Sequence, residues 1–159
     1  MRLFMGQKGL TLIELVIALA ILGILAAAVL PMAEVTVTRT KEIELRRALR
    51  TIRTAIDEYK DDFDRAKDQK KILTSIDEIG YPESLDVLLE GRDWGGLYPY
   101  QKKYLRRIPK DPFDPYGEGW GLRSLEDDPD STVWGGENVY DVYSQSDAIG
   151  LDGTAYNTW

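Results

Sequence analysis

The sequence predicts an α+β fold in which a long N-terminal helix packs against a small antiparallel sheet with long loops. Three patterns support this prediction. An uncharged apolar run extends from Leu15 to Ala33, and apolar residues then recur every three or four positions as far as Phe63. Late in the chain, two short stretches alternate between polar and apolar or aromatic residues. The first two patterns are typical of helices and the third of strands.

The apolar run from Leu15 to Ala33 is close to the roughly 20 residues that a helix needs to cross a bilayer. A domain of this size can hardly surround a helix that is apolar on every face, so a membrane span is favoured over a buried core helix. A secretory signal peptide is the other alternative, because alanines follow the run. Arg2 and Lys8 precede the run, which favours a cytoplasmic N-terminus and an external C-terminal domain.

The helical pattern continues beyond Pro31, where the missing backbone hydrogen bond predicts a kink. We expect a single helix from about Leu10 to Arg65. Its second half, residues 34–66, has charged residues on one face and serves as the spine of a globular domain formed by residues 67–159. The predicted apolar face of this half consists of Leu45, Leu49, Ile52, Ile56, Tyr59 and Phe63.

The remainder of the chain predicts few regular elements. A short helix is expected within YPESLDVLLE, ended by Gly91, and strands are expected at Trp120–Ser124 and Val139–Ser144. The segment between Gly91 and Trp120 is rich in glycine, proline and aromatic residues and is predicted to be loop. It holds four basic residues that form either a binding patch, a solvated face or a counter-charge for an acidic partner: Lys102, Lys103, Arg106 and Arg107.

The composition excludes several classes of function. The chain of 159 residues has a net charge of −7, and no basic stripe offsets it, so we expect no nucleic-acid partner. It has neither cysteine nor histidine, which removes disulfides, thiolate chemistry, the commonest zinc ligands and the commonest general base. Paired carboxylates remain available for acid–base chemistry, but no pair stands out. We therefore expect a protein that is not an enzyme.

The stretch KGLTLIELVIALAILGILAAAVLP resembles the class III signal of type IV pilins and type II secretion pseudopilins. A short basic leader, a glycine, an apolar residue and then a glutamate follow one another in the family's register. The resemblance implies that a prepilin peptidase removes residues 1–9 between Gly9 and Leu10, and that the new Leu10 amine is N-methylated. Segment 10–33 then stays on the mature chain as a transmembrane helix, with Pro31 at the family's proline position. Leu10 departs from the commoner phenylalanine, but it is also apolar.

Glu14 is the unusual residue of this segment, because a carboxylate in hydrocarbon costs several kcal/mol and usually marks function. The resemblance implies that Glu14 of one subunit pairs with the Leu10 amine of its neighbour in a filament. Such a pair desolvates two charges, so its main effect is to specify register, since a wrong stagger leaves a buried unpaired carboxylate. The alternative is an incidental residue whose carboxylate reaches the membrane interface.

The C-terminal stretch YDVYSQSDAIGLDGTAYNTW resembles the loop in which major pseudopilins bind a calcium ion through aspartates and backbone carbonyls. Calcium takes six to eight oxygen ligands, and the candidates are Ser144, Asp147, Asp152, Thr154 and Asn157. The spacing is not that of an EF-hand. The alternative is a loop of Asx-turns in which the two aspartates only accept backbone hydrogen bonds. Trp159 is expected to anchor the tail by packing.

The resemblance implies a structural subunit of a type II secretion pseudopilus that drives export of folded proteins. The implied partners are further copies of the chain, minor pseudopilins, the prepilin peptidase, and an inner-membrane platform with its assembly ATPase. The protein is expected in the bacterial inner membrane as a single-pass chain with its C-terminal domain, and the assembled filament, in the periplasm. The alternatives are a type IV pilin of a surface pilus and a single-pass anchored binding domain.

Overall fold

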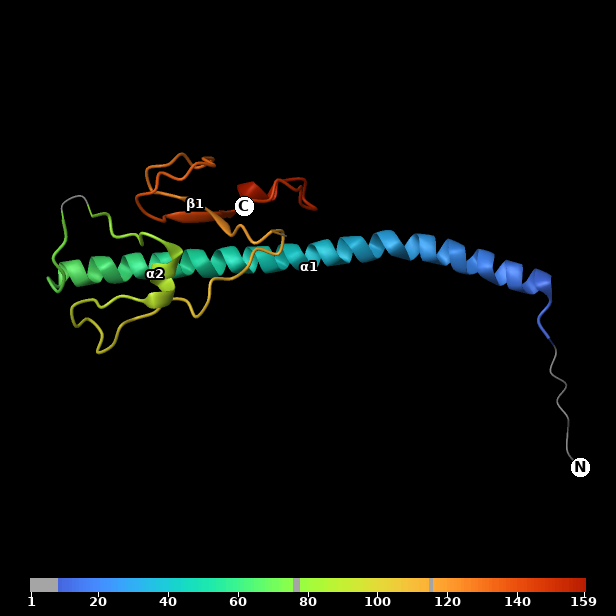
Figure 1. Cartoon of the computed structure of the whole chain (residues 1–159), viewed down its shortest axis with the longest axis horizontal. Coiled ribbons are helices and arrows are strands. Elements are labelled where there is room, and N and C mark those ends of the chain that lie inside the picture. The colour runs from blue at the N-terminus through green and yellow to red at the C-terminus, as the bar shows by residue number, and fades with distance from the viewer. Residues whose placement is uncertain (1–8, 76–77, 115) are drawn as a thin grey trace, which may run out of the picture. The chain divides into compact units, whose positions relative to one another are not determined.

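The computed structural model describes residues 9–75, 78–114 and 116–159. In chain order it contains helix α1 (Leu12–Asp68), helix α2 (Leu85–Glu90), strands β1 (Trp120–Arg123) and β2 (Asp141–Ser144), and the short 3-10 helix η1 (Tyr156–Thr158) (Figure 1). This order confirms the predicted α+β fold with a long N-terminal helix. The chain divides into two units, Met1–Arg39 and Thr40–Trp159, and each is described by itself. Most of the predicted leader, residues 1–8, lies outside the described residues.

In the first unit, α1 begins at Leu12, two residues later than the sequence predicts. Thr11 caps the start of α1, because its Oγ1 accepts a hydrogen bond from the backbone N–H of Glu14, at 3.3 Å. Helix α1 continues through Pro31 without a break, and the kink at that residue stays a prediction. The described part of the chain contains one helix that is long and apolar enough to cross a membrane, and it is α1.

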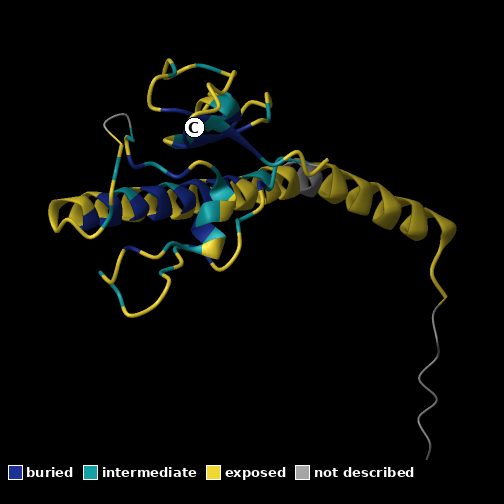
Figure 2. Ribbon diagram, turned by 60° about the vertical axis from the view of Figure 1, so that its left-hand side comes forward, coloured by how far each residue is buried: buried dark blue, intermediate teal, exposed yellow. Residues whose placement is uncertain are grey.

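In the second unit, α1 supplies the predicted apolar face to the core. All six predicted residues, from Leu45 to Phe63, are at most 3% exposed (Figure 2). The helix continues three residues beyond the predicted end, to Asp68, because Ala66 is also fully buried in the core. The backbone then turns at Lys70, which has a positive φ of 53°.

Helix α2 packs Leu88 into the same core, with no exposed surface left on that side chain. It ends at Gly91, as predicted, where φ is 83°. A Cβ atom at this position would lie 2.5 Å from the carbonyl oxygen of Lys102, so only glycine fits against the returning chain. The backbone of Tyr104 and Leu105 then donates to the carbonyl of Leu88, which ties the long loop to α2.

Strands β1 and β2 form a two-stranded antiparallel sheet in which Trp120 lies opposite Ser144 and Gly121 opposite Tyr143. The second strand starts two residues later than predicted, because the N–H of Val139 donates to the carbonyl of Pro82 outside the sheet. The ring of Tyr143 lies over Gly121, where an added Cβ would approach it to 2.2 Å. The missing side chain of Gly121 is therefore what allows the ring to cover the strand pair.

Candidate assembly segment and C-terminal anchor

The predicted cleavage and assembly residues all lie at the exposed start of α1. Gly9 has open space around it, since an added Cβ would meet no atom within 4 Å. Leu10 is 73% exposed, and Glu14 lies exposed in the first turn of the helix. A carboxylate in the first turn interacts favourably with the positive end of the helix dipole. The chain thus presents Leu10 and Glu14 together to whatever surrounds this segment.

The apolar side chains of the first unit are exposed wherever the structure describes them. Leu12 is 84% exposed and Ile24 is 72% exposed, and none of the described residues from Leu12 to Ala27 is even partly buried (Figure 2). A helix that is apolar on all sides is stable only when lipid or other helices cover it. This segment therefore depends on a membrane or on neighbouring copies.

The five predicted calcium ligands form separate hydrogen-bonded groups instead of one oxygen cage. Ser144 is fully buried at the end of β2, where its Oγ accepts from the N–H of Ser146. Asp147 accepts from the side-chain amide of Asn157 at 2.8 Å. Asp152 accepts from both the N–H and the hydroxyl of Thr154, at 3.0 and 2.7 Å. Ser144 and Asp152 each accept from the N–H two residues later, as in the loop of Asx-turns that the sequence allows as the alternative to a calcium site.

A cation of the protein itself also contacts this loop, because Arg46 lies 3.2 Å from the second carboxylate oxygen of Asp152. Among the residues that the structure describes, no three acidic side chains come together in a group that would hold a metal ion. Arg46 therefore occupies one oxygen of a predicted calcium ligand, and calcium binding stays a prediction.

Three charged residues of α1 hold the C-terminal region, and we call Glu42, Arg46 and Arg53 the helix clamp. Glu42 is only 8% exposed, and its Oε1 accepts from the N–H of Leu151 at 2.6 Å and from the hydroxyl of Tyr156 at 3.1 Å. Burial and the adjacent Glu42 carboxylate raise the pKa of Tyr156 to about 12. The hydroxyl therefore stays protonated and remains a donor at physiological pH.

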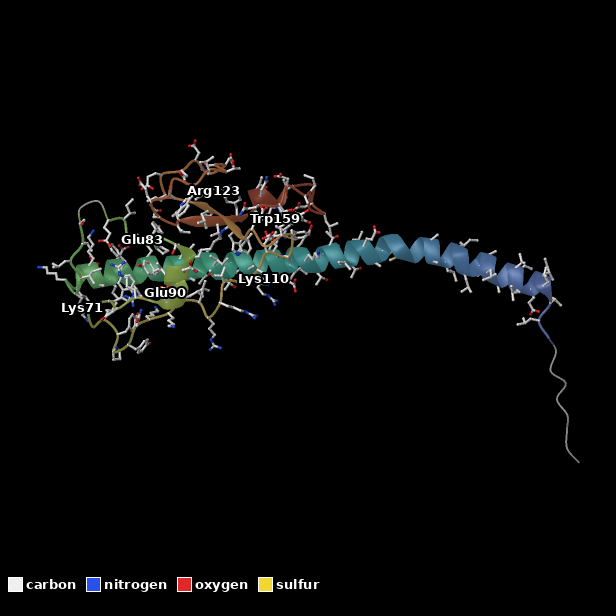
Figure 3. All side chains as sticks on the ribbon, in the orientation of Figure 1. Lys71, Glu83, Glu90, Lys110, Arg123 and Trp159 are labelled. Carbon is white, nitrogen blue, oxygen red and sulfur yellow. The ribbon has the colours of Figure 1, made fainter. Side chains whose placement is uncertain are left out.

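Arg53 joins three parts of the C-terminal region. Its Nε donates to Asp141 at 2.6 Å, and one terminal nitrogen donates to the carbonyl oxygens of Val142 at 3.0 Å and Trp159 at 2.9 Å. Trp159, labelled in Figure 3, packs edge-on against Tyr156, with ring centroids 5.0 Å apart. The guanidinium of Arg46 lies 4.2 Å from a Trp159 ring centroid. Trp159 thus serves as the predicted packing anchor.

The helix clamp is not among the residues predicted from the sequence, although the spacing of its members carries a partial signal. The three clamp residues follow one another at spacings of four and seven, which places them on one side of the helix, along the edge of its apolar face. Charged residues along the edge of an apolar face can bind polar groups of the segment that packs on that face.

Replacing Arg53 by methionine is expected to lower the melting temperature of the full chain in detergent by about 5 °C. The change removes hydrogen bonds to three acceptors and is expected to cost about 1–2 kcal/mol, because Arg53 is partly exposed. Differential scanning fluorimetry measures the shift. Arg47→Met is the matched control, since Arg47 is exposed on the same helix. Equal shifts in both variants would contradict the anchoring role of Arg53.

A second polar cluster, centred on Asp62, binds the loop after α2 to the C-terminal end of α1. Asp62 is 1% exposed and accepts from the hydroxyls of Tyr98 and Tyr104 and from the ammonium of Lys102, at 2.9, 2.8 and 2.6 Å. Burial alone raises the pKa of Asp62, but the hydrogen bonds from Lys102 and the two tyrosines outweigh it and hold the pKa below the ordinary value. Lys102 therefore has an internal role, unlike the exposed Lys103, Arg106 and Arg107.

Comparison with known proteins decides the family. Residues 4–30 match a family model described as the prokaryotic N-terminal methylation motif. Over 141 residues, the chain is 30% identical to the type II secretion system core protein G of Pseudomonas aeruginosa, which covers 83% of this chain and 96% of that protein. The chain belongs to the major pseudopilins of type II secretion systems. No solved structure matches this pseudopilin.

Family membership explains the exposed motif at the start of α1 and the polar contacts of the second unit. The matched motif includes Gly9, Leu10 and Glu14 in one register, which is the pattern that a lone membrane anchor does not need. The role of the pseudopilin is structural, as a subunit of a pseudopilus. Its clamp and its buried Asp62 cluster then serve to hold a small domain rigid on its helix.

Proposed function

We propose that this pseudopilin polymerises in the periplasm into a short filament whose growth drives the export of folded proteins. The observation that carries the proposal is the match to core protein G over nearly all of both chains. This match also favours a secretion pseudopilus over a surface pilus. The exposed apolar face of the first unit supports polymerisation, because it needs partners once the chain leaves the lipid.

Processing at the N-terminus precedes assembly in this proposal. A prepilin peptidase on the cytoplasmic side cuts after Gly9, and the new amine of Leu10 is methylated. The chain then sits in the inner membrane with its N-terminus in the cytoplasm, as the basic residues before the span favour. The exposure of Gly9 and Leu10 supports access by an enzyme.

Assembly then joins the Leu10 amine of one subunit to Glu14 of the next. A subunit added at the wrong stagger leaves a buried carboxylate unpaired, so the pair selects one register. Minor pseudopilins and an inner-membrane platform with a cytoplasmic ATPase complete the proposed machinery. This function requires no reaction catalysed by the chain itself, and the absence of catalytic activity stays a prediction.

Intact mass and N-terminal sequencing of the chain from its host membranes test the proposed processing. The expected mature chain starts at methylated Leu10. A chain that still starts at Met1 beside an active prepilin peptidase, or one cut after the apolar run, would remove the basis for filament assembly. The protein would then be an anchored or secreted domain.

Calcium binding by the C-terminal loop is a proposal of its own, in which the ion competes with Arg46 for Asp152. The chemistry of the loop supplies carboxylates and neutral oxygens, but the observed ion pair opposes binding. We expect Arg46→Gln to enlarge the rise in melting temperature that millimolar calcium produces. Arg47→Gln is the control. A calcium response that is the same in Arg46→Gln and in the parent chain would contradict this competition.

A further inference from the structure

Four exposed cations lie on or beside a groove in the second unit. Arg50 on α1 and Lys103, Arg106 and Arg107 in the loop after α2 are exposed, and none of the four forms an ion pair with a described residue. We call these four residues the basic surface. Unpaired cations gathered in one place offer a site for an acidic partner.

The groove itself has a volume of about 330 Å³ and runs between α1 and the loop. Ala55 and Leu105 contribute apolar surface, and Thr54 and Tyr104 contribute polar and aromatic surface. Its lining holds one cation, Arg50, and one acid, Glu58. Lys103 and Arg106 add positive charge beside it, because they are the chain neighbours of the lining residues Tyr104 and Leu105. The groove therefore suits a protruding segment that combines a small apolar side chain with acidic flanks.

Residues 125–137, which we call the acidic loop, have that combination. Glu126, Asp128, Asp130 and Glu137 are exposed, and none of them forms an ion pair with a described residue. Between these acids, Val133 is 75% exposed and Trp134 is 37% exposed. An exposed valine beside a half-covered tryptophan is the kind of anchor that interfaces bury.

The acidic loop is held in shape before any partner binds. Asp127 closes it by accepting from the N–H groups of Ser124 and Gly135, at 2.7 and 3.1 Å. The indole N–H of Trp134 donates to the carbonyl of Asn138 at 2.8 Å. A preformed loop loses little conformational entropy on docking.

The two surfaces cannot meet within one copy. Figures 1 and 2 both show the acidic loop and the segment that carries Lys103, Arg106 and Arg107 on opposite sides of the second half of α1. Complementary surfaces on opposite sides of one molecule form a head-to-tail contact, which repeats into an open helical chain rather than closing as a two-fold dimer.

We propose that the acidic loop of one copy docks on the basic surface of the next, with Val133 entering the groove beside Ala55 and Leu105. This inference rests on the proposed filament, and it adds a contact between globular domains to the contact at Glu14. The charges set the direction and specificity of addition, and the apolar anchor supplies buried area.

Cysteine cross-linking tests the contact, because the chain has no cysteine of its own. Val133→Cys and Thr54→Cys are placed in separate full-length chains that are expressed together, and the sheared filaments are oxidised. We expect a covalent dimer from the mixture and none from either variant alone, because a head-to-tail contact never brings two copies of one position together. Val133→Cys mixed with Leu73→Cys is the control, since Leu73 is fully exposed and is not among the residues that line the groove.

Charge reversal tests whether attraction between the acidic loop and the basic surface holds the two copies together. In the cross-linking mixture, Arg106→Glu with Arg107→Glu is expected to lower the yield of dimer about fivefold, and adding Asp128→Arg with Asp130→Arg is expected to restore it. The control for the restoration uses Asp57→Arg with Asp61→Arg in place of the two changes in the acidic loop. Both residues are exposed acids on α1 outside the acidic loop, so these changes should not restore the yield.

The outcomes separate this inference from the proposed function. Filaments that form normally but give no Val133–Thr54 dimer, or that give as much dimer in the Leu73 control, would overturn the docking contact and leave the function intact. An unchanged yield after charge reversal would do the same. Failure of the unmodified chain to form filaments would instead remove the proposed function itself.

Discussion

Cells that express the Glu14→Ala variant are expected to contain the chain in their membranes but at least about tenfold fewer sheared filaments than cells with the parent chain. Insertion should persist because the apolar run is unchanged. In the proposed filament of the parent chain, a neighbour added at the wrong stagger leaves a carboxylate unpaired in an apolar surrounding, at a cost of about 3 kcal/mol or more. That cost corresponds to a preference of more than about a hundredfold for the correct register. Alanine removes the preference, so regular growth fails.

Electron microscopy and quantification of the sheared fraction measure the result. Glu34→Ala is the matched control, because Glu34 is the next acidic residue of α1 and is also exposed. Glu14→Gln separates charge from shape: it should fail like alanine if an ion pair with Leu10 sets the register. Normal filaments from Glu14→Gln would show that hydrogen bonding alone is sufficient and would contradict the ion pair.

The second large effect is expected at Asp62, where replacement by alanine should lower the melting temperature by about 10 °C. The substitution leaves Lys102 and two tyrosine hydroxyls without their shared acceptor, and breaking such a buried pair costs about 3 kcal/mol. The loop that contains Tyr98 and Tyr104 would then separate from α1. Thermal unfolding of the full chain in detergent measures the change, with Asp61→Ala as the exposed neighbouring control.

The same residue predicts a dependence on pH. Because the pKa of Asp62 is lower in the folded chain than the ordinary value of 3.8, its contribution to stability is present above that value and is lost as the pH falls below it. Asp62→Asn removes this titration, so its melting temperature should fall less steeply with acid than that of the parent. Identical slopes in the parent and in Asp62→Asn would show that Asp62 gains no stability from its charged form.

The sequence predicted the features that depend on local pattern. The apolar face of α1 follows from the helical period alone, and Gly91 ends α2 because its conformation suits glycine. The N-terminal motif is also local, since Gly9, Leu10 and Glu14 lie within one turn or two of each other. These predictions required no knowledge of which distant segments meet.

Predictions that required distant partners were less complete. Glu42 contacts Leu151, which is 109 residues away in sequence, and Arg53 contacts Asp141, 88 residues away. No spacing rule links such pairs, so the helix clamp was missed. For the same reason no local pattern places Arg46 of α1 at the Asp152 carboxylate, and the calcium ligands of this loop stay a prediction.

The aromatic cover over Gly121 has a consequence for how the domain opens. A two-stranded sheet alone is marginally stable in water, and its backbone amides would exchange quickly with solvent. The Tyr143 ring packs on Gly121 and is only 6% exposed, so it covers the strand pair at that point. Deuterium should therefore enter β1 and β2 only when the ring lifts together with the surrounding core, which makes the smallest element of the fold a reporter of its global opening.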